Sequence, residues 1–128
     1  MMNNKDIQTI VIVGAGTMGR GIAYVSILAG FRTILIDVSE VLLQTAHSRI
    51  RQDLQSGLDR GKVTATAMEQ ALGRLILDSD ILHAAAEADF VIEAIPERID
   101  LKLDLFTRLD RACPRHTILA SNTSALSI

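Results

Sequence analysis

The chain has 128 residues, of which 48% are hydrophobic and 3% aromatic, with 13 basic and 15 acidic residues. This length suits one domain with a sizeable apolar core. The nearly balanced charge and the few aromatic side chains give no basis for binding nucleic acid or an anionic membrane surface, and no apolar stretch is long enough to cross a membrane. The single cysteine, Cys113, excludes an internal disulfide and fits a reducing compartment, so we expect a soluble, cytoplasmic protein.

The first predicted strand, residues 9–13, runs directly into the sequence GAGTMG at residues 14–19. A G-x-G-x-x-G turn between a strand and a helix is typical of dinucleotide-binding proteins. Gly14 would permit the tight turn, Gly16 the approach of a pyrophosphate, and Gly19 the close packing of the helix on the strand. The helix predicted over residues 18–28 would direct its free N–H groups and positive dipole end at that pyrophosphate.

A second apolar strand, residues 33–36, ends at Asp37, eighteen residues after the last glycine of the turn. A carboxylate at this position would bind the ribose hydroxyls of an adenosine and repel a 2′-phosphate. The sequence therefore predicts NAD, rather than NADP, as the cofactor. The alternative is that Asp37 only caps the following helix.

A pair of helices is predicted after the second strand. The first is amphipathic over residues 39–54 and would be broken by Gly57 and Gly61. The second would begin with the capping box Thr66–Glu69 and end at Gly73. This pair is longer than an ordinary connection between parallel strands.

Three further strands, at residues 75–77, 90–94 and 117–120, and a helix over residues 98–112 complete the pattern. The strands are nearly continuous in apolar residues, as expected where both faces of a sheet are covered. Their alternation with helices predicts an α/β fold, a Rossmann-type doubly wound parallel sheet with a helical pair inserted after the second strand. Ligands bind beyond the carboxyl ends of such strands, so the loops at residues 14–19, 95–102 and 121–124 should converge on one crevice.

Two of these loops carry polar side chains. The segment 93–98, followed by Lys102, places a carboxylate and a cation at the crevice, although a solvated helix start would look the same. Residues 121–124, with the sequence SNTS, could hydrogen-bond a carbonyl oxygen or carboxamide, or cap the next helix. For each of these two segments, the spacing alone leaves open whether it binds a ligand or only starts a helix.

Three segments together resemble the NAD-binding domain of the L-3-hydroxyacyl-CoA dehydrogenase family, which includes 3-hydroxybutyryl-CoA dehydrogenases. They are GAGTMGRGIA from Gly14, ADFVIEAIPERIDLKLDLF from Ala88 and TILASNTSALSI from Thr117. The resemblance implies NAD-dependent oxidation of a 3-hydroxyacyl-CoA to the 3-ketoacyl-CoA, or the reverse, in fatty acid metabolism. It also implies a homodimer, an acyl-CoA substrate and no metal.

The resemblance further implies which residues form the site. Ser124 would be catalytic, binding the oxygen at the third carbon of the substrate, and Lys102 would lie near both the substrate and the nicotinamide ribose. Pro96 stands where the family usually has a residue with a free N–H. The residues implied in cofactor binding are Gly14, Ala15, Gly16, Thr17, Met18, Gly19, Asp37, Ile95, Pro96, Glu97, Lys102 and Ser124.

The family's catalytic histidine, the glutamate that orients it and a helical domain all follow the SNTS motif. We therefore expect residues 1–128 to be the NAD-binding domain of a longer enzyme, inactive alone and without the family's C-terminal helical domain. The projecting helical pair, which the family would place against CoA, has four basic and four acidic residues between positions 39 and 73. Two alternatives stay open: a dehydrogenase of another 3-hydroxy acid or carrier-bound acyl group, and a non-catalytic NAD-binding module.

Overall fold

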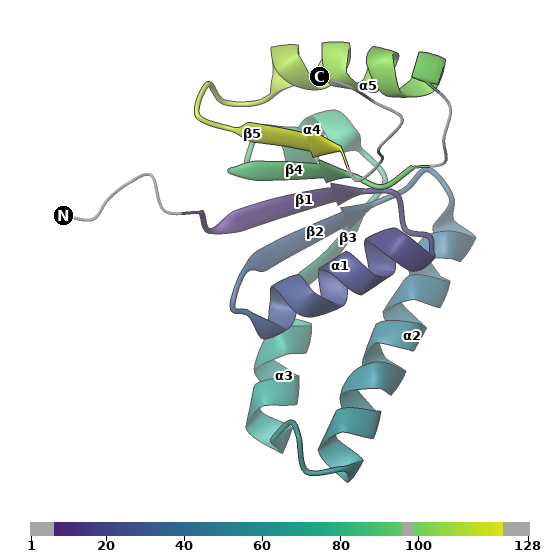
Figure 1. Ribbon diagram of the computed structural model, residues 1–128, viewed down its shortest axis with the longest axis vertical. Helices are drawn as coiled ribbons and strands as arrows, with labels where there is room; N and C mark the ends of the chain where they lie inside the picture. The colour runs from purple at the N-terminus through teal and green to yellow at the C-terminus, as the bar shows by residue number, and fades with distance from the viewer. Residues whose placement is uncertain (1–6, 96–98, 122–128) are drawn as a thin grey trace, which may run out of the picture.

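The computed structural model describes residues 7–95 and 99–121 (Figure 1). Five strands form one sheet in the order β3-β2-β1-β4-β5, and every neighbouring pair is parallel. This arrangement confirms the predicted Rossmann-type fold. The strands are β1 (Thr9–Val13), β2 (Arg32–Ile36), β3 (Leu75–Asp78), β4 (Phe90–Glu93) and β5 (Ile118–Ser121).

Helices cover both faces of this sheet. They are α1 (Thr17–Leu28), α2 (Glu40–Asp59), α3 (Ala65–Gly73), α4 (Ile81–Ala85) and α5 (Ile99–Ala112). The first three lie on one face, and α4 and α5 lie on the other (Figure 1). Within the described residues, no helix is both long and apolar enough to cross a membrane.

The central strand β1 shows why its sequence is apolar throughout. Ile10 and Ile12 belong to the core beneath α1 and α2, whereas Val11 and Val13 belong to the core beneath α4 and α5. Successive side chains of a strand point to opposite faces, so a strand with two covered faces has no solvent-facing position. The strand that leads into the glycine turn is therefore packed against helices on both faces.

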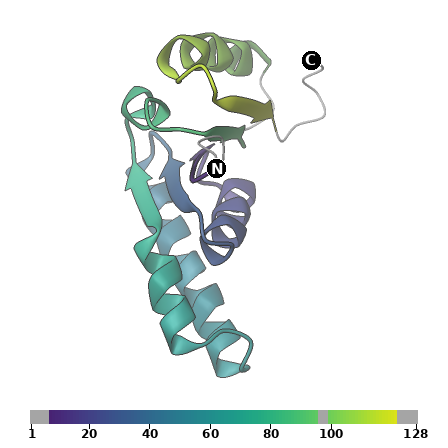
Figure 2. The ribbon, with the colours of Figure 1, turned by 90° about the vertical axis from the view of Figure 1, so that its left-hand side faces the viewer.

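The helices α2 and α3 extend together beyond the sheet (Figures 1 and 2). Gly57 was predicted to break α2, but it lies inside the helix and is buried. A Cβ at Gly57 would lie 2.9 Å from a methyl carbon of Val63, so glycine here lets the turn between the two helices pack closely. The helix instead ends at Asp59, before Gly61, whose φ of +74° suits glycine.

Two helix starts differ from the predictions. The capping box at Thr66 is wrong, because Thr64 caps α3 by accepting a hydrogen bond from the N–H of Ala67 at 3.0 Å. Thr64 has the extended backbone that an N-cap needs, whereas Thr66 lies within the first turn. The short helix α4 was not predicted, although Asp80 caps it by accepting from the N–H groups of Leu82 and His83.

Asp89 joins three strands at the edge of the sheet opposite the glycine turn. Its Oδ2 accepts hydrogen bonds from the N–H groups of Gln8 (3.0 Å) and Thr9 (2.9 Å), at the start of β1. Its Oδ1 lies 2.7 Å from Nε2 of His116, which precedes β5. Since Asp89 itself immediately precedes β4, one carboxylate fixes the beginnings of β1, β4 and β5.

Candidate functional site

The turn after β1 requires glycine at two positions. Gly14 has a φ of +113°, and a Cβ there would lie 2.7 Å from the carbonyl oxygen of Ala94. A Cβ at Gly19 would overlap the carbonyl oxygen of Gly14. Both glycines therefore allow the close contacts of this turn with β4 and with the start of α1.

Gly16 differs from these two glycines, because neither its backbone conformation nor a neighbour among the described residues requires glycine. Its φ is −73°, and no atom of residues 7–95 or 99–121 lies within 4 Å of a Cβ built there. Gly16 is the N-cap of α1, supplies no capping side chain, and is followed by a first turn without acidic residues. Among the described residues, space is thus left at Gly16, beside the positive end of a 12-residue helix, an arrangement suited to a phosphate group.

Asp37 connects the glycine turn to the end of β2. Its Oδ2 accepts a hydrogen bond from the N–H of Ala15, and its Oδ1 accepts one from the N–H of Ser39, both at 2.9 Å. Each carboxylate oxygen has two lone pairs and retains capacity for one further donor. The sequence predicts that Asp37 binds a ribose, but it did not indicate that Asp37 also holds the turn in place.

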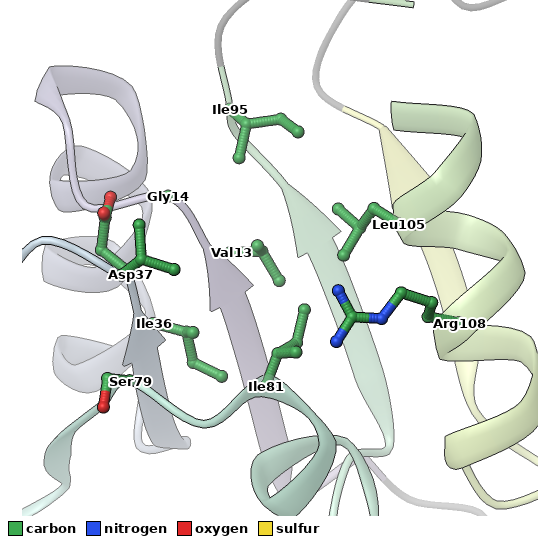
Figure 3. Close-up of a pocket in the computed structure, with 10 residues that line it drawn as sticks. Val13, Gly14, Ile36, Asp37, Ser79, Ile81, Ile95, Leu105 and Arg108 are labelled. Carbon is green, nitrogen blue, oxygen red and sulfur yellow. The ribbon is translucent and has the colours of Figure 1, made fainter. Parts of the chain in front are cut away.

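A cavity of about 340 Å³ opens beside Asp37 at the carboxyl ends of β1 and β2 (Figure 3). This volume lies at the lower end of the range for ligand pockets. Aliphatic side chains form most of its wall, and polar groups stand at its margins. The lining residues are Val13, Gly14, Ile36, Asp37, Val38, Ser79, Ile81, Ile95, Leu105 and Arg108.

The arrangement fits the adenosine and pyrophosphate of a dinucleotide. An aliphatic slot takes a flat base, a carboxylate with free acceptor capacity takes ribose hydroxyls, and an open helix N-terminus takes a pyrophosphate. The three features adjoin one another, since Gly14 and Asp37 both line the cavity and Asp37 binds the turn that leads into α1.

A buried carboxylate fixes the turn after β4. Glu93 is fully buried, and its Oε2 accepts a hydrogen bond from the N–H of Ile95 at 2.6 Å. The N–H of Ala94 binds the carbonyl oxygen of Val13 at 2.8 Å, which continues the pairing with β1. These bonds set the path of the chain that carries Ile95 to the cavity. The carboxylate of Glu93 is thus buried and hydrogen-bonded within the protein.

The predicted site residues are placed as follows. Gly14, Asp37 and Ile95 meet at the cavity, Ala15 and Gly16 form the adjoining turn, and Thr17, Met18 and Gly19 begin α1. Pro96, Glu97 and Ser124 lie outside the described residues, as does the side chain of Lys102, whose backbone belongs to α5. The strand β5 pairs with β4 through Ser121 and Glu93, so the third predicted loop starts beside the second.

None of the histidines in the described part of the chain lines the cavity. His83 forms an ion pair with Asp78 at 3.2 Å, and this hydrogen-bonded carboxylate raises the pKa of the histidine. His116 pairs with Asp89 at the opposite edge of the sheet, and His47 lies on α2. Cys113 is half-buried, and burial raises the pKa of its thiol, which disfavours the reactive thiolate.

Residues 9–128 match the family model described as "3-hydroxyacyl-CoA dehydrogenase, NAD binding domain". The 3-hydroxyadipyl-CoA dehydrogenase of Escherichia coli (strain K12) is 46% identical over 123 residues, a match that covers 96% of this chain and 26% of that protein. The probable 3-hydroxybutyryl-CoA dehydrogenase of Bacillus subtilis (strain 168) is 42% identical over 123 residues, covering 96% of this chain and 42% of that protein.

Among solved structures, 3-hydroxybutyryl-CoA dehydrogenase from Escherichia coli K12 superposes with a TM-score of 0.92 at 45% sequence identity. The match covers 96% of this chain and 26% of that one. The chain thus spans less than half the length of these relatives. The comparisons confirm both the predicted family and NAD as the cofactor. The chain belongs to the 3-hydroxyacyl-CoA dehydrogenase family, whose NAD-binding domain it forms.

Proposed function

We propose that this chain is the cofactor domain of an enzyme that oxidises a 3-hydroxyacyl-CoA to the 3-ketoacyl-CoA, or catalyses the reverse reduction. One observation carries the proposal: an aliphatic cavity, a carboxylate and an open helix N-terminus adjoin at the carboxyl ends of β1 and β2. The relatives support the reaction, since their names describe dehydrogenases of 3-hydroxyacyl-CoA compounds.

In this proposal the adenosine half of NAD occupies the cavity. Asp37 accepts hydrogen bonds from the ribose hydroxyls, and the turn from Gly14 to Gly19 receives the pyrophosphate at the N-terminus of α1. By the family resemblance, Ile95, Pro96, Glu97 and Lys102 contribute to binding of the nicotinamide half. When bound, NAD supplies the acceptor or donor of a hydride. The chain's own contribution is to bind the cofactor and fix its direction across the ends of the strands.

The substrate side of the proposal rests on the family resemblance. Ser124 is the catalytic residue of this chain and donates a hydrogen bond to the oxygen at the third carbon of the substrate. Lys102 contacts the acyl-CoA. The general base is a histidine of the family's C-terminal helical domain, which completes the site in a homodimeric, cytoplasmic enzyme. Residues 1–128 would then bind the cofactor without turning over substrate.

A second candidate substrate is a 3-hydroxy acid without CoA, or an acyl group on another carrier. The helices α2 and α3 favour it, because the charges between positions 39 and 73 sum to zero. CoA carries several phosphate charges, and a positive helical pair would attract them.

The rates of the whole enzyme with acetoacetyl-CoA and with free acetoacetate, followed by NADH oxidation, separate these functions. We expect kcat/KM to be at least about tenfold higher for the CoA ester, because remote binding energy accelerates the reaction. Ser124→Ala should lower kcat about 10²–10³-fold, the usual effect of losing one such donor, while changing NADH affinity less. Equal rates would favour the second candidate, and NADH binding without turnover of either compound would indicate a non-catalytic module.

A further inference from the structure

Arg108 stands at the wall of the cavity, and no described residue forms an ion pair with it. It lies on α5, its side chain is exposed, and it lines the cavity together with Leu105, one helical turn earlier. Within the described part of the chain, no carboxylate forms an ion pair with it and no hydrogen bond engages its guanidinium. Figure 3 shows the guanidinium turned toward the cavity rather than away from it.

Asp37 and Arg108 lie on opposite sides of the cavity. Between them are the aliphatic side chains of Val13, Ile36 and Ile81 (Figure 3). A nucleoside whose ribose binds Asp37 would have its base in this aliphatic space, on the side toward Arg108. A guanidinium is planar and weakly hydrated, and it stacks on aromatic rings more readily than an ammonium does.

We propose that Arg108 packs its guanidinium against the adenine ring and so contributes to recognition of the adenosine half of the cofactor. The inference rests on the proposed function, because it places adenosine in this cavity. Neither the sequence motifs nor the family resemblance pointed to this residue. Helix α5 then forms the wall of the base-binding slot opposite β2.

Binding of ADP-ribose, adenosine and nicotinamide mononucleotide to the purified chain tests this contact by calorimetry. We expect Arg108→Met to weaken ADP-ribose and adenosine by a similar factor, about three- to tenfold, and to leave nicotinamide mononucleotide unchanged. Arg108→Lys should recover part of the affinity, since it keeps the charge but not the planar group. The matched control is Arg111→Met, which removes the same charge from the same helix outside the cavity.

Three results would overturn the proposal. Arg108→Met could bind both adenine ligands as well as the unmodified chain does. It could lose affinity for ADP-ribose but not for adenosine, which would assign the arginine to a phosphate. It could weaken all three ligands to the same extent as Arg111→Met, which would indicate a general charge effect. Thermal unfolding of each variant checks the fold. If the unmodified chain binds no ADP-ribose, the proposed function fails before this inference is reached.

Discussion

The two oxygens of Asp37 each accept a backbone N–H, from Ala15 and from Ser39, and the same carboxylate lines the cavity. The side chain therefore has a structural part and, in the proposed function, a ligand-binding part. A substitution would affect both parts. A loosened turn should weaken the binding of NADH and NADPH alike, whereas loss of cofactor discrimination should change the ratio of their affinities. A measurement that compares the two nucleotides therefore separates these effects.

Asp37→Ala should weaken NADH binding and narrow the difference in affinity between NADH and NADPH. The substitution removes an acceptor for the 2′-hydroxyl and also removes the charge that repels a 2′-phosphate. Fluorescence titration with both nucleotides measures the two affinities. Asp53→Ala is the control, because it removes the same charge from an exposed position on α2. An unchanged ratio of the two affinities would refute the assignment of Asp37.

Substitutions at Gly14 and at Gly16 should differ in their effect on the free energy of unfolding. Gly14→Ser forces a side chain onto a φ of +113° and against the Ala94 carbonyl, so we expect unfolding free energy to fall by about 1–3 kcal/mol. Gly16→Ser places a side chain at an N-cap, where serine is favoured and where no described atom lies close. It should change the unfolding free energy by less than about 0.5 kcal/mol. Urea unfolding compares them, and equal losses would contradict these two roles.

At the scale of secondary structure, the glycine turn and the five strands could be predicted because each signal lies within a few neighbouring residues. The positions of helix breaks could not. Gly57 looks like a breaker in sequence, but its buried contact with Val63 depends on how α2 meets α3. The five residues of α4 are too few to show a helical period, and the cap at Asp80 was recognised only in the structure.

The strand-linking carboxylate of Asp89 predicts a pH dependence of stability. Burial raises the pKa of Asp89. Hydrogen bonds from the N–H groups of Thr9 and Gln8 and the nearby His116 lower it by more than burial raises it. The pKa of Asp89 therefore lies below the usual value of 3.8. The folded state then binds fewer protons than the unfolded state. The stabilisation is present above about pH 3.8 and is lost as pH falls through the folded-state pKa.

Asp89→Asn should therefore lower the unfolding free energy at pH 7 by about 1–3 kcal/mol, because it disturbs acceptors for two backbone N–H groups. The difference from the unmodified chain should shrink as pH is lowered below about 3.8. Urea unfolding across this pH range measures it, with Asp53→Asn as the control for charge alone. A loss that stays constant down to pH 2 would contradict the proposed linkage.

At the scale of the whole molecule, the parallel sheet brings together groups that are distant in sequence. The predicted convergence of loops follows from the fold class, since β1, β4 and β5 are neighbours and their carboxyl ends share one edge. The side-chain contacts around the cavity did not follow. The hydrogen bonds of Asp37 to Ala15 and of Glu93 to Ile95, and the place of Arg108 on the cavity wall, depend on backbone positions that no motif encodes.

The central claim is that the cavity beside Asp37 and the open N-terminus of α1 hold NAD. The most direct test is titration of NADH into the purified chain and into Gly16→Val, followed by fluorescence. We predict that the unmodified chain binds NADH with a Kd in the micromolar-to-millimolar range, as an order of magnitude. Gly16→Val should bind it at least about tenfold more weakly at similar thermal stability, because its side chain fills the space for the pyrophosphate. Equal binding by the two proteins, or no binding by the unmodified chain, would contradict the claim.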